Sequence, residues 1–251
     1  MKRTAWKRLI SERLQQRRRR RGSHSQIGLE RLEQRTYLAA TAVLFDNELQ
    51  VLSFGDESIT VQADSGGTGN VQVLIDGVLS SGVPAFPASR LERIQIFAGP
   101  GDNTIDLSLV SSVDFSFIDP VTGNGLSILV DAGDGHDTIF SSLNLNDTLL
   151  GGDGDDTINR DPASLFSGIV SIGNLTIDAG DGHDTVFGGE GNDTIVGGDG
   201  RDFVSGWLGD DSINGGDGRD EIDAGDGADF VDGGDGADLV RGSDGNDTLH
   251  G

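Results

Sequence analysis

The clearest pattern in the chain is an aliphatic side chain at every ninth position from residue 179 to residue 250. This stretch divides without gaps into eight nonapeptides: AGDGHDTVF, GGEGNDTIV, GGDGRDFVS, GWLGDDSIN, GGDGRDEID, AGDGADFVD, GGDGADLVR and GSDGNDTLH. Position 4 is Gly, position 6 is Asp and position 8 is aliphatic in every one. Glycines at the start of each unit permit a tight turn, and positions 7–9 then predict a short strand whose middle side chain points inward.

Fading copies of the unit precede the regular array. Two complete units occupy 132–140 and 151–159, and 98–106 (AGPGDNTID) keeps the frame with Asn103 in place of the aspartate. Residues 160–177 interrupt the series as an extra-long coil or a loop. In front of these units, alternating apolar residues bounded by Gly, Asp, Asn and Pro predict strands at 48–54, 59–63, 71–75, 94–97, 115–118 and 127–130.

These patterns predict an all-β chain. Residues 94–106, 128–140 and 175–187 share one design, a strand that leads directly into a glycine turn. This favours a continuous β-solenoid, irregular first and regular at its end. A separate small β-sandwich before the array is the alternative. The expected parts are a basic segment (1–40), an irregular β region (41–131), outlying repeats with an insertion (132–178) and the regular array (179–251).

The turn chemistry of the repeat points to a hard cation. Glycines direct backbone carbonyls into the turn, and the aspartate at position 6 adds a carboxylate beside them. Oxygen ligands of this kind, in a chain without cysteine, suit Ca²⁺ rather than Zn²⁺. Mg²⁺ keeps its own waters and fits such a cage poorly.

The array resembles the haemolysin-type (RTX) calcium-binding nonapeptide repeats. The resemblance implies a parallel β-roll in which two nonapeptides form one coil and calcium lies between turns two repeats apart. Six interior sites are then expected from the eight contiguous repeats. Trp207 and Leu208 depart from the pattern at positions 2 and 3, which implies a distorted site or a tryptophan that caps an exposed edge. The implied carboxylate ligands are Asp137, Asp156, Asp184, Asp193, Asp202, Asp211, Asp220, Asp229, Asp238 and Asp247.

Charge is distributed very unevenly along the chain. Residues 1–38 carry 12 Lys and Arg against 3 Glu, whereas the rest carries 6 Arg against 39 Asp and Glu. A body this acidic repels nucleic acid and anionic membranes and attracts cations, so no nucleic-acid partner is expected. Hydrophobic residues make up only 35% of the chain, which argues against the thick core of a doubly wound enzyme.

The basic N-terminal segment, which the sequence leaves as helical or disordered, includes five consecutive arginines, Arg17–Arg21. The following LERLEQRTYLAATAVLF resembles the N-terminal signature of Planctomycete extracellular proteins, which implies export or surface attachment. A nucleic-acid arm is the alternative. The apolar stretch 36–45 is short for a signal peptide, and no 18-residue apolar run predicts a transmembrane segment.

No catalytic motif accompanies the repeats. His136 and His183 occupy position 5, an exposed turn site where Asp, Asn, Arg and Ala also occur, and neither a zinc-protease motif nor a nucleophile elbow is present. The sequence thus predicts a non-enzymatic, extracellular or cell-surface calcium-binding protein with a structural or adhesive role, for which a cell-surface or matrix component is a candidate partner. The alternative is the calcium-folded tail of a secreted enzyme or toxin.

Calcium should be a condition of folding. Residues 179–250 bury about one aliphatic side chain per nine residues, and they carry 17 Asp and 2 Glu against 3 Arg. One buried side chain contributes roughly 2 kcal/mol, whereas ordering nine residues costs roughly 13 kcal/mol. We therefore expect circular dichroism to show little β structure in chelator and a gain at roughly 0.1–1 mM Ca²⁺. A spectrum unchanged by EDTA and by added calcium would contradict this.

Overall fold

The computed structural model describes residues 41–45, 47–64, 69–111, 114–115, 125–143, 145–159 and 173–251. The basic segment 1–40, most of the strand expected at 115–118 and residues 160–172 of the interruption lie outside these ranges. The regular structure of the described residues consists of strands, apart from one short 3-10 turn at Ala88–Arg90. None of them forms a helix long and apolar enough to cross a bilayer.

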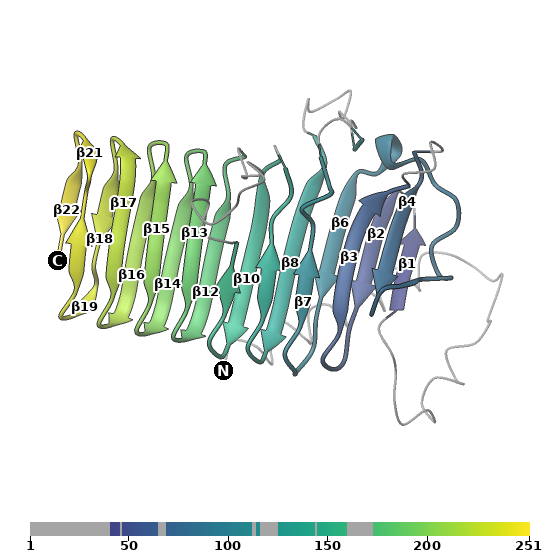
Figure 1. Ribbon diagram of the computed structural model, residues 1–251, viewed down its shortest axis with the longest axis horizontal. Helices are drawn as coiled ribbons and strands as arrows, with labels where there is room; N and C mark the ends of the chain where they lie inside the picture. The colour runs from purple at the N-terminus through teal and green to yellow at the C-terminus, as the bar shows by residue number, and fades with distance from the viewer. Residues whose placement is uncertain are drawn as a thin grey trace, which may run out of the picture. The chain divides into compact units, whose positions relative to one another are not determined.

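The strands form two eleven-stranded sheets, A and B, which run the length of the described chain (Figure 1). Sheet A consists of β1 (Thr41–Phe45), β2 (Glu48–Leu52), β6 (Arg93–Phe97), β8 (Ser127–Asp134), β10 (Asp147–Asp153), β12 (Thr176–Gly182), β14 (Thr194–Gly200), β16 (Ser212–Gly218), β18 (Phe230–Asp232), β19 (Asp235–Gly236) and β22 (Thr248–His250). Sheet B consists of β3 (Ser58–Ala63), β4 (Val71–Ile75), β5 (Val78–Leu79), β7 (Thr104–Asp106), β9 (Thr138–Phe140), β11 (Thr157–Ile158), β13 (Thr185–Glu190), β15 (Phe203–Leu208), β17 (Glu221–Gly227), β20 (Leu239–Arg241) and β21 (Asp244–Gly245).

From β8 to β18 the chain alternates between the sheets, so that one coil of the solenoid contributes one strand to each sheet. Strands of successive coils pair in parallel; Thr176 lies opposite Thr194, and Thr194 lies opposite Ser212. The offset of 18 residues is two nonapeptides. The expected parallel β-roll with two repeats per coil is therefore what the structure contains.

The irregular β region belongs to the same solenoid. β6 pairs in parallel with β2 on one side and β8 on the other, and β7 joins β3 to β9 in the same way. Only the first strands pair antiparallel: β1 with β2, β3 with β4, and β4 with β5. Of the two alternatives for this region, the continuous solenoid is the one observed, because both sheets pass through it without a break.

The core lies between the two sheets and consists of inward-facing aliphatic side chains. At position 8 of the array, Ile195 and Ile213 from sheet A are 1% exposed, and Val204 and Ile222 from sheet B are fully buried. Leu249 in the last coil is 44% exposed, because a neighbouring coil covers it on one side only. The ninth-residue hydrophobic pattern thus becomes one continuous column between the sheets.

Strands in the array are longer than the three residues expected from the repeat. β14 and β16 each run for seven residues, because the backbone of positions 1–4 also pairs between coils, as between Gly180 and Gly198. This close approach requires glycine. Gly198 has a φ of +116°, and a Cβ built on it would lie 1.9 Å from the carbonyl oxygen of Gly180.

Trp207 is accommodated without a break in the stack. It pairs in register with Gly189 on one side and Gly225 on the other, in the interior of sheet B, so it does not cap an edge. Its φ of +81° shows that it adopts the conformation that glycine has at this position in other repeats. The expectation that Trp207 caps an edge is therefore wrong, and the neighbouring Asp211 keeps the hydrogen bonds of its turn.

Replacing Gly198 by alanine should destabilise the roll. The added methyl group meets a backbone carbonyl that cannot move without displacing the next coil, and the positive φ alone costs about 1–3 kcal/mol. In saturating calcium, the urea midpoint of G198A should fall below that of the wild type. G55A is the matched control, because the nearest atom to its Cβ is a flexible side-chain oxygen at 3.5 Å. Equal midpoints for the two variants would contradict the argument.

Candidate metal sites in the turns

The position-6 aspartates form two rows, one along each edge of the solenoid. The first row lies in the turns from sheet A to sheet B, and the second lies in the turns from sheet B to sheet A. The first row contains Asp137, Asp156, Asp184, Asp202, Asp220 and Asp238, and the second contains Asp193, Asp211, Asp229 and Asp247. All ten predicted site residues therefore lie in equivalent turns.

One carboxylate oxygen of each aspartate belongs to a ladder of hydrogen bonds. In the first row, the backbone N–H of Asp156 donates to Asp184 Oδ1 at 2.7 Å, and that of Asp184 donates to Asp202 Oδ1 at 2.9 Å. In the second row, the N–H of Asp193 donates to Asp211 Oδ1 at 2.8 Å. Each side chain is thereby fixed against the preceding coil with its second oxygen directed into the turn.

The second oxygen has no partner. In nine of the ten aspartates Oδ2 is buried without a hydrogen bond; the nine are Asp137, Asp156, Asp184, Asp193, Asp202, Asp211, Asp220, Asp229 and Asp238. Nearly all buried polar atoms in folded proteins have a partner, because leaving one unpaired costs on the order of 1–3 kcal/mol, and more if it is charged. Nine equivalent exceptions indicate that the turns lack a positively charged group.

The carboxyl pKa values also indicate that the turns lack positive charge. Burial raises the pKa of Asp156 and of Asp211 to about 8, and that of Asp137, Asp184 and Asp193 to about 6, from an ordinary value of 3.8. The backbone N–H donors lower these values without cancelling the effect of burial, and for Asp156 and Asp211 the charges of nearby aspartates raise them further. Burial therefore shifts the balance of these five carboxyl groups toward the neutral acid.

Backbone carbonyls converge on the same spaces. The spot where a Cβ of Gly206 would lie is 2.3 Å from Asp211 Oδ2 and 2.3 Å from the carbonyl oxygen of Ala224 in the next coil. Two oxygen acceptors with room between them suit a hard cation. No group of three or more His, Asp and Glu side chains within the described ranges could hold a metal, so carbonyl oxygens must supply much of any coordination. The residues therefore fit Ca²⁺, whose usual ligands are carbonyls and carboxylates.

The two outlying repeats are part of the first row. Asp137 N–H donates to Asp156 Oδ1 at 2.8 Å, and the ladder continues from Asp156 to Asp184 although 28 residues separate them in sequence. The space between two stacked turns whose aspartates are linked in this way is called an interval here. The first row contains five intervals and the second contains three. This is two more than the six expected from the contiguous repeats alone.

The second row stops where position 6 changes. Leu175 occupies that position in the coil before Asp193, and its N–H donates to Asp193 Oδ1 at 2.7 Å. In the coil before that, Asp147 is buried, but the N–H and hydroxyl of Ser142 donate to its two oxygens. Asp147 was not among the site residues predicted from the sequence, although Asn146-Asp147-Thr148 repeats the order of positions 5–7.

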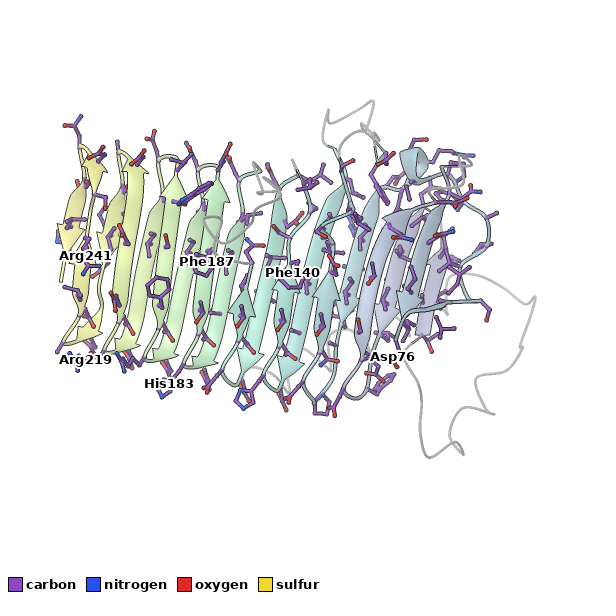
Figure 2. All side chains as sticks on the ribbon, viewed as in Figure 1. Asp76, Phe140, His183, Phe187, Arg219 and Arg241 are labelled. Atoms are coloured by element: carbon purple, nitrogen blue, oxygen red, sulfur yellow. The ribbon has the colours of Figure 1, made fainter. Side chains whose placement is uncertain are left out.

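The position-5 side chains form a second ladder outside the first. The Nδ1 atoms of His136 and His183 accept the N–H groups of Asp155 and Arg201, each at 2.8 Å. Figure 2 shows His183 and Arg219, both at position 5, pointing away from the stack at one edge, whereas Phe140 and Phe187 lie over the face of a sheet. The two histidines thus link successive turns through their ring nitrogens.

Comparison with known protein families agrees with this geometry. The model of the RTX calcium-binding nonapeptide repeat matches the chain in four copies, at residues 144–161, 178–213, 187–222 and 208–240. The matches include eight of the ten position-6 aspartates, all except Asp137 and Asp247. Comparisons with curated proteins and with solved structures gave no match.

The raised carboxyl pKa values predict that acid substitutes in part for the metal. The folded pKa values of about 6 to 8 lie above the unfolded value of 3.8, so the stability gained by protonation is complete below pH 3.8 and is lost as pH rises through 6 to 8. In chelator, circular dichroism should show more β structure at pH 5 than at pH 8. Calcium binding at pH 7 should release protons, which calorimetry in buffers of different ionisation enthalpy measures.

A control separates this effect from general charge screening. Sodium chloride at pH 8 screens exposed carboxylates but cannot reach the buried ones, so about 0.5 M salt should not restore the β signal. Equal spectra at pH 5 and pH 8 would contradict the assignment of the buried carboxylates.

Proposed function

We propose that this chain, whose residues 144–161 and 178–240 are RTX calcium-binding nonapeptide repeats, is a calcium-folded protein that acts outside the cell as a structural or adhesive element. Calcium binding is the property of the repeats themselves. The observation that carries the proposal is the row of buried Oδ2 atoms without partners, because it makes the folded roll dependent on a cation.

The proposed ligands are the Oδ2 atoms of the ten position-6 aspartates and the carbonyl oxygens of the glycine turns beside them. Bound calcium supplies the positive charge that the turns lack. Each interval is bordered by aspartates of two coils, as with Asp184 and Asp202, so binding at one interval orders the edge that the next coil pairs with. Folding of the roll should therefore be cooperative in calcium.

The dependence on calcium favours a site of action outside the cell. Extracellular calcium modules bind with dissociation constants of about 10⁻⁴–10⁻³ M, whereas cytosolic sensors respond at about 10⁻⁷–10⁻⁵ M. A roll that folds only in the first range stays unfolded during synthesis and folds after export. RTX repeat proteins are typically secreted, and the Leu-Glu-rich signature of the N-terminal segment supports the same proposal.

A non-enzymatic role is proposed from the composition of the turns. Their repeating chemistry consists of carboxylates and carbonyls that face each other between coils, and the exposed histidines at position 5 hydrogen-bond to backbone N–H groups. Neither arrangement presents a nucleophile with a base. A regular stack with a repeating outer surface suits attachment to a cell-surface or matrix component.

Calorimetry with a pair of adjacent variants tests the proposal. The wild-type chain should bind about eight calcium ions, one for each interval between stacked aspartates. D211A removes a carboxylate that borders two intervals of the second row and should bind one or two ions fewer. The control D210A changes the neighbouring exposed residue, whose Oδ1 only accepts the N–H of Ala228, and should bind as many ions as the wild type.

Two results would count against calcium-coupled folding by these residues. One is a wild-type stoichiometry of zero or one. The other is an equal loss of ions in D211A and D210A, since that would place the binding outside the buried aspartates.

A further inference from the structure

Asn103 occupies position 6 in the coil that precedes the first calcium-type turn, and it is 1% exposed. Its Oδ1 accepts the N–H of Glu57 in the previous coil at 3.2 Å. The Oδ1 atom of each position-6 aspartate likewise accepts a backbone N–H from the coil before it. Its Nδ2 donates to the carbonyl oxygens of Gly101 at 2.8 Å and of Gly99 at 3.2 Å, which are positions 4 and 2 of the same turn. The amide nitrogen therefore stands where an aspartate has its unpaired Oδ2.

This substitution changes what the turn requires. An aspartate oxygen cannot donate to carbonyl oxygens, so a cation or a proton must come between them. The amide of Asn103 carries its own hydrogens and satisfies the two carbonyls directly. In a coil with asparagine at this position, the polar atoms of the turn have hydrogen-bond partners without a metal ion.

The polar atoms of the turn in the coil before it also have hydrogen-bond partners within the protein. Glu57 holds the equivalent place, and its Oε2 accepts the N–H of Gly55 at 2.9 Å and the hydroxyl of Ser53. Ser53 lies in hydrogen-bonding reach of Asn103 Oδ1 as well, at 3.3 Å. Neither turn contains a buried side-chain oxygen or nitrogen without a partner, in contrast to every turn from Asp137 to Asp238 in the same row.

Strands β2 and β6 of this region bury more large apolar side chains than a strand of the regular array such as β14. β2 buries Leu49 and Val51, and β6 buries Ile94 and Ile96, all fully. β14 in the regular array buries one large side chain, Ile195, beside a glycine. Because each fully buried aliphatic side chain contributes about 1.5–3 kcal/mol, a strand of the first kind gains about twice as much from burial.

We propose that strands β1 to β7 form a base that folds without calcium, and that Asn103 is the residue that ends the calcium array at this coil. The base then offers the first calcium coil a folded edge. β6 and β7 pair with β8 and β9, and the N–H of Asn103 donates to Asp137 Oδ1 at 2.7 Å. The calcium-independence of the base goes beyond the proposed function, whereas the role of Asn103 as the end of the array rests on it.

Hydrogen exchange of the full chain, followed by mass spectrometry, tests the base directly. In EDTA at pH 7.5, amides of β2, β3, β6 and β7 should exchange slowly, while those of β12 to β18 exchange as in an unfolded chain. In saturating calcium both regions should be protected. Exchange of β2, β3, β6 and β7 as fast as the array in EDTA would overturn the proposal.

Two asparagine substitutions test the role of Asn103. N103D replaces the donating amide with an oxygen, so the base should lose protection in EDTA, regain it in calcium and bind one more ion than the wild type. N192D is the matched control, because Asn192 is exposed at position 5 and its Oδ1 accepts the N–H of Asp210, as an aspartate oxygen would. N103D with wild-type protection and ion count would overturn the assignment.

The reciprocal variant D184N tests the same role of the position-6 amide, and its result decides the question if N103D does not fold. An amide at position 184 should satisfy its own turn, so the variant should bind at least one ion fewer and stay protected in calcium. Wild-type stoichiometry in D184N would overturn the role given to the amide. If the wild type binds no calcium, the proposed function fails; if it binds calcium but the base unfolds in EDTA, only this inference fails.

Discussion

The structure depends on a carboxylate that is buried with only one of its two oxygens hydrogen-bonded. Oδ1 of each position-6 aspartate accepts a backbone N–H from the preceding coil, which holds neighbouring turns in register. Oδ2 faces carbonyl oxygens with nothing to donate to it. The same side chain therefore holds neighbouring coils in register through Oδ1 and destabilises the folded stack through Oδ2. A bound cation determines which of the two effects is larger. Under the proposed function, metal binding and folding are therefore one equilibrium.

Parallel stacking multiplies this electrostatic demand. Because coils repeat every 18 residues, like residues lie directly over like residues, so Asp181, Asp199 and Asp217 form an exposed column at position 3. Strands lie about 4.8 Å apart, where two unit charges in water repel by somewhat less than about 1 kcal/mol. Repulsion within the exposed columns thus lowers the stability of the roll by only a small amount per pair, and salt screens this repulsion. The buried rows oppose folding more strongly, because neither solvent nor salt reaches them.

The two ends of the solenoid achieve the same coil geometry by different chemistry. In β2 and β6, two aliphatic side chains per strand fill the space between the sheets, and Asn103 and Glu57 satisfy the turns with protein atoms alone. In β14 of the array, one large aliphatic side chain lies between the sheets, and under the proposed function a cation completes the turns. In the turns, the change from one chemistry to the other lies between the amide of Asn103 and the carboxylate of Asp137. A solenoid tolerates such a change because each coil contacts only its neighbours.

The sequence alone predicted the repeating unit and the type of metal, because a nine-residue period with fixed Gly, Asp and aliphatic positions leaves one face for the core and one for the turn. The parallel roll and the two-repeat coil were implied by the resemblance of the array to RTX repeats. Only the tertiary structure decided the rest. It placed Asp137 and Asp156 in one row with Asp184 across the interruption, which adjacency in sequence cannot reveal. It showed that Asp147 is satisfied by Ser142 and that Trp207 keeps the glycine conformation within the sheet. These outcomes depend on which coil lies next to which, and that is set by hydrogen bonds between segments far apart in the chain.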